Sequence, residues 1–115
     1  MFTICYLGKR INEKNILGEE EKRIIFSPEY VYVEQKSVKY NEYYQAMMNG
    51  QRPELLISMN KFEFYDFFES SVEQFARVLN PITNKLIDYT ILRTYEKDDD
   101  TIELTLTRGI DNVGA

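Results

Sequence analysis

The sequence contains no histidine and no tryptophan, and its single cysteine is Cys5. Without histidine, neither a serine–histidine triad nor a histidine metal site can be built. A single cysteine without a histidine partner is a poor nucleophile, and we expect Cys5 to be buried in an apolar strand. It also excludes an intrachain disulfide. The sequence therefore predicts a protein that is not an enzyme, with no catalytic residues, no cofactor and no metal site.

Long apolar runs and glycine-rich loops are missing as well. The longest apolar runs span only a few residues, far fewer than a membrane-spanning helix needs. In "MFTICYLGKR" the apolar stretch comes before the charges, which is the reverse of a secretory signal. The five glycines are scattered and form no phosphate-binding loop. With 115 residues, 43% of them hydrophobic, we expect one soluble cytoplasmic domain over residues 1–115.

Basic residues are fewer than acidic ones: the sequence has 14 Lys and Arg against 19 Asp and Glu, and its net charge is −5. This balance argues against a surface that wraps nucleic acid by neutralising its phosphates. We expect the acidic runs at residues 19–21 and 98–100 to be solvated loops, the alternative being a face that repels DNA. Acids also interleave the rings of "FEFYDFFE", which favours core or interface aromatics over a base-stacking platform.

Alternating side chains predict strands. In "TIELTLTR", Ile102, Leu104 and Leu106 alternate with polar residues, which indicates a half-buried strand. "LIDYTILRTY" precedes it across the polar connection "EKDDD", so the two predict a β-hairpin. Further strands are expected within residues 2–7, 30–38, 53–60 and 73–79, with residues 8–23 as a long mobile loop. About six strands in a chain of this length predict a mainly β fold, a small antiparallel barrel or sandwich.

One short helix is expected between strands, in "NEYYQAMMNGQRPE". Asn41 suits the N-cap, Gly50 suits the position after the last turn, and Pro53 prevents continuation. The aromatic segment at residues 61–71 fits either a helical turn or a strand edge, and its periodicity does not choose between them.

Several motifs in order resemble the head closure, or head–tail adaptor, proteins of tailed bacteriophages and prophages. The resemblance covers roughly residues 30–108. Its elements are a loose "V-x-S-V" at residues 33–38, "EYYQA" at 42–46, "GQRPE" at 50–54, "YTILRTY" at 89–95 and "IEL" at 102–104. The chain departs from the family where "NPITNKLIDY" replaces a glycine-containing turn and where "FEFYDFFESS" replaces an "EYNGE" type segment.

The resemblance implies a small barrel whose copies form a ring below the portal. Such a ring retains packaged DNA, docks the tail and performs no catalysis. The implied partners are the portal or adaptor protein, tail-completion proteins, other copies of the chain, and DNA passing through the channel without sequence-specific binding. The implied location is the virion, assembled in the bacterial cytoplasm. The alternatives are a tail completion or terminator protein and, in another class, a small oligonucleotide-binding barrel.

Within this resemblance, the helix and loop at residues 41–54 face neighbouring subunits or the channel. Tyrosine and methionine suit packing anchors, and polar residues suit the rim of an interface. An equally open interpretation is that the helix plugs one end of the barrel. The predicted subunit or partner interface consists of Glu42, Tyr43, Tyr44, Gln45, Met47 and Gln51.

Overall fold

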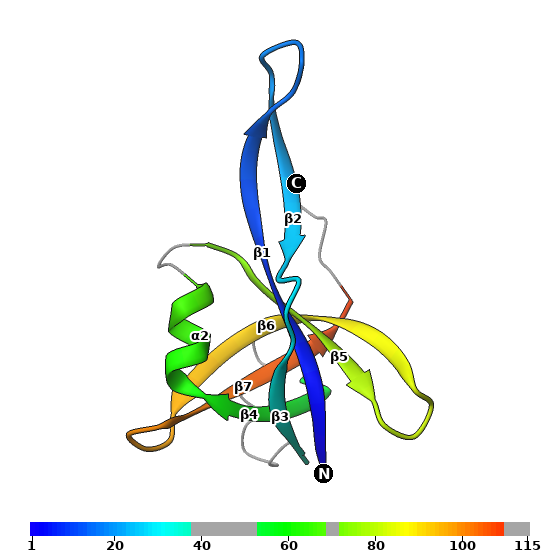
Figure 1. Ribbon diagram of the computed structural model, residues 1–115, viewed down its shortest axis with the longest axis vertical. Helices are drawn as coiled ribbons and strands as arrows, with labels where there is room; N and C mark the ends of the chain where they lie inside the picture. Colours follow the sequence, from blue (N-terminus) through cyan, green and yellow to red (C-terminus); the bar gives the residue numbers. More distant parts are fainter. Residues whose placement is uncertain (38–52, 69–71, 110–115) are drawn as a thin grey trace.

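The computed structural model describes residues 1–37, 53–68 and 72–109, which form strands and one short helix (Figure 1). The mainly β class expected from the sequence is confirmed, whereas the helix predicted at residues 41–50 lies outside the described residues. The elements are β1 (Phe2–Lys14), β2 (Glu20–Phe26), β3 (Val31–Lys36), β4 (Leu55–Asn60), α2 (Lys61–Phe67), β5 (Gln74–Asn80), β6 (Lys85–Glu96) and β7 (Thr101–Arg108).

Six of these strands close into an antiparallel barrel in the order β1-β3-β4-β7-β6-β5. Closure comes from β1, because its first residues pair with β3 while Cys5 to Lys9 pair with β5, including Cys5 with Val78. A barrel has no open sheet edge around its circumference, so each barrel strand can satisfy its backbone groups on both sides. The predicted choice between barrel and sandwich is thus decided for the barrel.

The seventh strand, β2, pairs only with the far half of β1, from Gly8 with Phe26 to Lys14 with Glu20. This hairpin extends away from the barrel (Figure 1), and we name residues 9–25 the arm. The prediction of a long loop at residues 8–23 was therefore wrong, because β1 continues to Lys14 and β2 begins at Glu20, which leaves a turn at residues 15–19. Gly18 lies in the turn, with φ of 79°, whereas Asn12 lies in β1 and pairs with Lys22 of β2.

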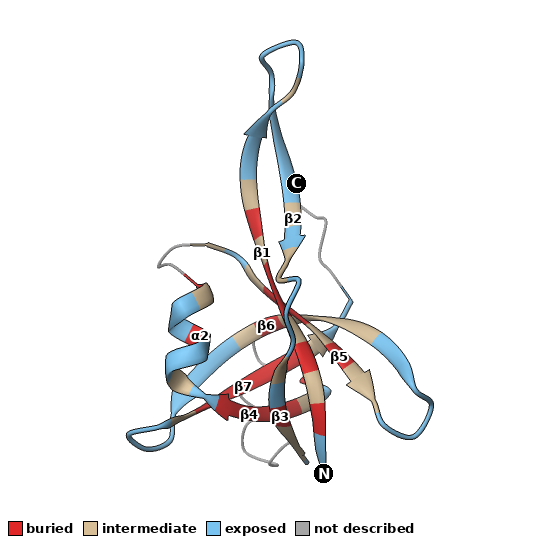
Figure 2. Cartoon of the chain, viewed as in Figure 1, coloured by how far each residue is buried: buried red, intermediate tan, exposed pale blue. Residues whose placement is uncertain are grey.

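The core lies inside the barrel, where buried residues form one hydrophobic cluster. Figure 2 colours the buried residues red along the barrel strands. Cys5 is fully buried there, as predicted, together with Ile102, Leu104 and Leu106. The other face of β7 is buried too, since Glu103 and Thr105 are only 7% and 4% exposed. The sequence predicted a half-buried strand with Glu103 and Thr105 on its exposed face, and this prediction was wrong because that face is buried. Lys36 of β3 reaches over β4 to the Glu103 carboxylate, at 3.4 Å, so this buried charge has a partner.

α2 resolves the ambiguity of the aromatic segment, because residues 61–67 are helical. Asn60 caps the helix by accepting hydrogen bonds from the backbone N–H groups of Phe62 and Glu63. The ring of Phe64 is buried in the core cluster, with its centroid 4.8 Å from that of Phe68. Within the described ranges, no helix has the length and apolarity to cross a membrane.

Candidate interaction surfaces

The interface predicted from the sequence cannot be placed, because it falls at residues 38–52, outside the described part of the chain. For Glu42, Tyr43, Tyr44, Gln45, Met47 and Gln51, the assignment stays a prediction. The described residues present other surfaces that can contact a partner: the arm, a pocket beside β6 and a cluster of tyrosines.

The tip of the arm holds two apolar side chains in solvent. Ile16 is 103% exposed and Leu17 is 79% exposed. In the turn that carries them, the Asn15 side-chain oxygen accepts hydrogen bonds from the backbone N–H groups of Leu17 and Glu19, at 2.9 and 3.0 Å. This hydrogen-bonded turn therefore exposes two hydrophobic side chains to solvent. Exposed apolar groups clustered at one site are typical of interaction surfaces.

The stem of the arm is strongly charged and has open edges. Residues 19–21 are exposed glutamates, as predicted, although two of them lie in β2 rather than in a loop. Arg23 pairs with Glu13 across the hairpin, at 3.2 Å. Among the described residues, β2 pairs with β1 alone, and from Ile11 onward β1 pairs with β2 alone. Open edges of this kind can accept a strand from another chain.

The root of the arm is fixed firmly to the barrel. A Cβ atom on Gly8 would come within 2.6 Å of the Phe26 ring, so only glycine fits beneath that ring. The ring in turn lies under the Arg77 guanidinium, 4.0 Å from it, and Arg77 donates two hydrogen bonds to Asp88. Arg10, which is buried, pairs with Glu73 at 3.0 Å. The arm is therefore a rigid extension of the barrel at its base.

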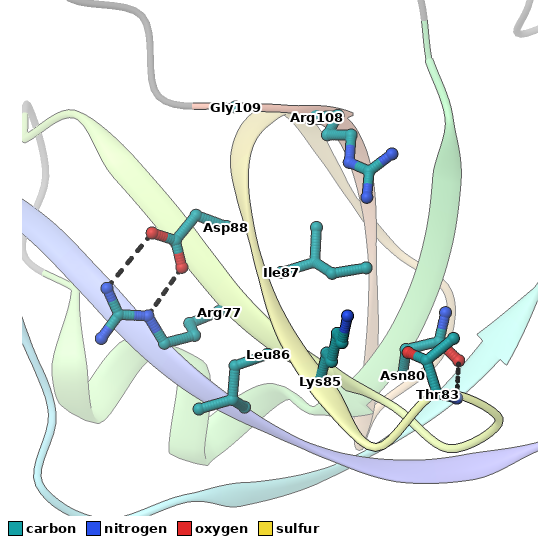
Figure 3. Close-up of a pocket in the computed structure, with 9 residues that line it drawn as sticks. All are labelled: Arg77, Asn80, Thr83, Lys85, Leu86, Ile87, Asp88, Arg108 and Gly109. Atoms are coloured by element: carbon teal, nitrogen blue, oxygen red, sulfur yellow. Dashed lines mark hydrogen bonds and ion pairs between the residues drawn. The ribbon is translucent and has the colours of Figure 1, made fainter.

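The second surface, the β6 pocket, is an open cavity of about 830 Å³ between the β5–β6 hairpin and the end of β7 (Figure 3). β7 ends at Arg108, which pairs with Tyr89, so the described strands leave the β6 edge unpaired from Lys85 to Ile87. Leu86 is 50% exposed in this region. The pocket is lined by Arg77, Asn80, Thr83, Lys85, Leu86, Ile87, Asp88, Arg108 and Gly109.

The charge of the β6 pocket is positive. Its one carboxylate, Asp88, is held by Arg77 at 2.6 Å, and this hydrogen bond is the main cause that raises the pKa of Arg77. Figure 3 shows this pair on one side of Ile87, with Lys85 and Arg108 on the other. Neither Lys85 nor Arg108 has an ion-pair partner among the described residues. Within the described residues, the pocket therefore combines two cations that have no ion-pair partner with the half-exposed side chain of Leu86.

The third surface is an edge-to-face row of Tyr6, Tyr30 and Tyr32, with ring centroids 6.2 and 5.5 Å apart. Hydrogen bonding to Tyr30 is the main cause that raises the pKa of Tyr32. Tyr32 and the neighbouring Phe2 are 70% and 74% exposed. Tyr30 and Tyr32 alternate along the chain with Val31 and Val33, and Val33 is buried. Rings that meet edge to face offer few open faces to a base, and the flanking charges of this row are Glu29 and Glu34.

No family model matches the chain, and no curated protein matches it. The resemblance to phage head closure proteins thus depends on the motifs at residues 30–108 alone. Function has to be argued from those motifs together with the surfaces described above.

Sequence reasoning missed the arm tip and the β6 pocket. The tip left a signal, since "NILG" places two apolar residues between two turn-forming residues. The pocket left none, because its lining comes from three strands and a turn that are brought together only by the barrel.

Proposed function

We propose that this protein is a structural component of a phage virion, of the head closure type. Its copies form a ring below the portal, retain packaged DNA and provide the docking surface for the tail. The proposal joins the motif order at residues 30–108 with a fold that suits a ring subunit. A small closed barrel is a self-contained body, and a rigid projection from it can reach a neighbour.

The observation that carries the proposal is the arm, with its apolar tip held away from the barrel (Figure 1). A monomer that acts alone gains no stability from leaving Ile16 and Leu17 in water, since burying either side chain would stabilise it by about 1.5–3 kcal/mol. A subunit of an assembly recovers that free energy when it meets its partner. The exposed arm is therefore the feature expected of a protein whose working state is an assembly.

Net charge supports the same function. A channel for DNA must let the duplex slide, so attractive contacts to its phosphates would hinder passage. The chain carries a net charge of −5, which disfavours tight contact with phosphates. The ring in this proposal closes the head by its geometry and by its partners, the portal or adaptor protein and the tail-completion proteins.

Complementation of a phage that lacks this gene tests the function. We expect the wild-type chain to restore filled heads that keep their DNA and join tails. Ile16→Ser with Leu17→Ser should fold normally, because both side chains are exposed, but should fail to restore these heads. Tyr43→Ser with Tyr44→Ser tests the interface predicted from the sequence in the same assay. Phe62→Ser is the control, since Phe62 is also exposed and apolar but lies on α2.

The particles that accumulate separate the proposal from its alternatives. Loss of head closure leaves heads that have lost their DNA, whereas loss of tail completion leaves filled heads beside unfinished tails. If a phage that lacks the chain still forms tailed particles that retain their DNA, both the head closure role and the tail completion role are overturned. Tight retention of single-stranded DNA in a filter-binding assay would instead favour the oligonucleotide-binding barrel.

A further inference from the structure

We propose that the arm of one copy docks into the β6 pocket of a second copy. Ile16 and Leu17 lie against Leu86 and Ile87, and the glutamates at residues 19–21 face Lys85 and Arg108. This inference specifies the contact between copies in the proposed ring. It rests on the proposed function only in requiring that copies contact each other.

The two surfaces complement each other in character. The arm tip presents two exposed aliphatic side chains and, after Gly18, three exposed carboxylates. The pocket presents the half-exposed Leu86 and the partly buried Ile87 beside two cations that have no ion-pair partner among the described residues. Opposite charges at the rim of an apolar contact fix its register and suppress wrong partners. In a chain with net charge −5, a pocket that offers two such cations is a specific target for the acidic run.

Backbone groups at the two surfaces are also available for pairing. The edge of β6 is unpaired from Lys85 to Ile87 within the described ranges, and the outer edge of β2 is unpaired along the arm. A strand added to an open edge gains affinity from main-chain hydrogen bonds and specificity from side chains. The arm therefore can extend the β5–β6 sheet of the copy that receives it.

The contact has to form between copies, because the arm and the β5–β6 hairpin extend from the barrel in different directions (Figure 1). The arm and the pocket are also different patches of the chain, so the contact is head-to-tail rather than two-fold symmetric. Head-to-tail contacts generate closed rings when the rotation closes, and filaments when it does not. One contact of this kind per copy is sufficient to build a ring.

Disulfide trapping tests the contact in solution. The chain suits this method because its only cysteine, Cys5, is fully buried and burial raises its pKa to about 12, which leaves the thiol protonated and unreactive. Leu17→Cys protein and Leu86→Cys protein are mixed at high concentration with a mild oxidant. We expect the 17–86 dimer to form at least about tenfold faster than the 17–62 dimer from Phe62→Cys protein, because docking raises the local thiol concentration.

Charge reversal tests the register. Lys85→Glu with Arg108→Glu, placed in the Leu86→Cys protein, should slow trapping to the rate of the 17–62 control. Glu19→Lys with Glu20→Lys, placed in the Leu17→Cys protein, should restore fast trapping with that charge-reversed Leu86→Cys protein. Asp99→Lys with Asp100→Lys changes the net charge by the same amount at another exposed acidic run and should not restore it. Each of these residues is exposed, so the variants keep the barrel core intact.

Two results would overturn the proposal. If Leu17→Cys protein dimerises with itself faster than with Leu86→Cys protein, the arms meet each other instead. If the 17–86 rate equals the 17–62 rate, the arm does not dock in the pocket. Neither result depends on phage heads, so failed trapping with successful complementation refutes this contact alone. Successful trapping by a chain that fails complementation refutes the head closure role alone.

Discussion

Gly8 occupies the residue on which the junction between barrel and arm depends. It pairs with Phe26 of β2 and with Phe75 of β5, so three strands meet at one backbone position. The Phe26 ring covers the space where a side chain would lie and carries the Arg77 guanidinium on top. A methyl group at this position must displace the ring, and the ring cannot move without leaving Arg77.

We predict that Gly8→Ala lowers the free energy of unfolding by about 1–3 kcal/mol, the usual cost of overpacking. The cost should fall when Phe26→Ala removes the ring, so the two changes should be coupled in a double-mutant cycle followed by urea denaturation. Gly18→Ala is the control, because its cost comes from a φ of 79° with open space around it and should not depend on Phe26. Strict additivity of Gly8→Ala and Phe26→Ala would show that the ring is not the obstacle.

Leu104 is fully buried, while Asp99 is exposed in the β6–β7 turn. Leu104→Ala should cost about 2–5 kcal/mol, because it removes buried methyl groups and leaves a cavity. The melting temperature should then fall by on the order of 10 °C or more. Asp99→Ala should change the melting temperature by less than about 2 °C. Calorimetry compares the two, and equal small shifts would mean that the core face of β7 is assigned wrongly.

At the scale of elements, β7 has both of its faces buried, as does its neighbour β4. Its outer face holds the Glu103 carboxylate, whose side chain is 8% exposed and whose partner is the Lys36 ammonium. A buried charge that loses its partner is left without solvation. The ion pair thus links β3 to β7 across the intervening β4.

We predict that Lys36→Met lowers the free energy of unfolding by about 1–3 kcal/mol, because it strands the Glu103 carboxylate. Adding Glu103→Gln should recover part of that loss, since a neutral amide is less costly to bury than a charge. Arg23→Met breaks the exposed Arg23–Glu13 pair instead and should change stability by under about 1 kcal/mol. Equal effects of Lys36→Met and Arg23→Met on urea denaturation would argue that Glu103 is solvated.

The C-terminal hairpin could be predicted and the arm could not, for a physical reason. Ile102, Leu104 and Leu106 alternate because one face of their strand meets the core, and that alternation is visible in the sequence. The arm lies outside the barrel and has no core face, so its strands carry charges on both sides. Its backbone ladder, rather than burial, holds it together. Barrel closure through Cys5 and Val78 was equally hidden, because alternation identifies strands and not their partners.

For the whole molecule, we predict a monomer in dilute solution. The arm and the β6 pocket offer a small contact, and copies that each carry a charge of −5 repel one another. Assembly into a ring therefore needs a template that holds copies side by side. Light scattering at micromolar concentration checks this, and a stable particle of the size of a ring would contradict it.

Closure of the barrel by β1 also has a consequence for how the chain folds during its synthesis. β1 leaves the ribosome before β5, which it requires as its neighbour, and Cys5 and Val78 are 73 positions apart in the chain. Until residues 74–80 emerge, β1 has one vacant edge, although the arm and the β1–β3 pairs can already form. Pairings so distant in sequence fold slowly, and unpaired edges in incomplete chains promote aggregation. We therefore expect nascent chains that stop before β5 to be the species that chaperones bind.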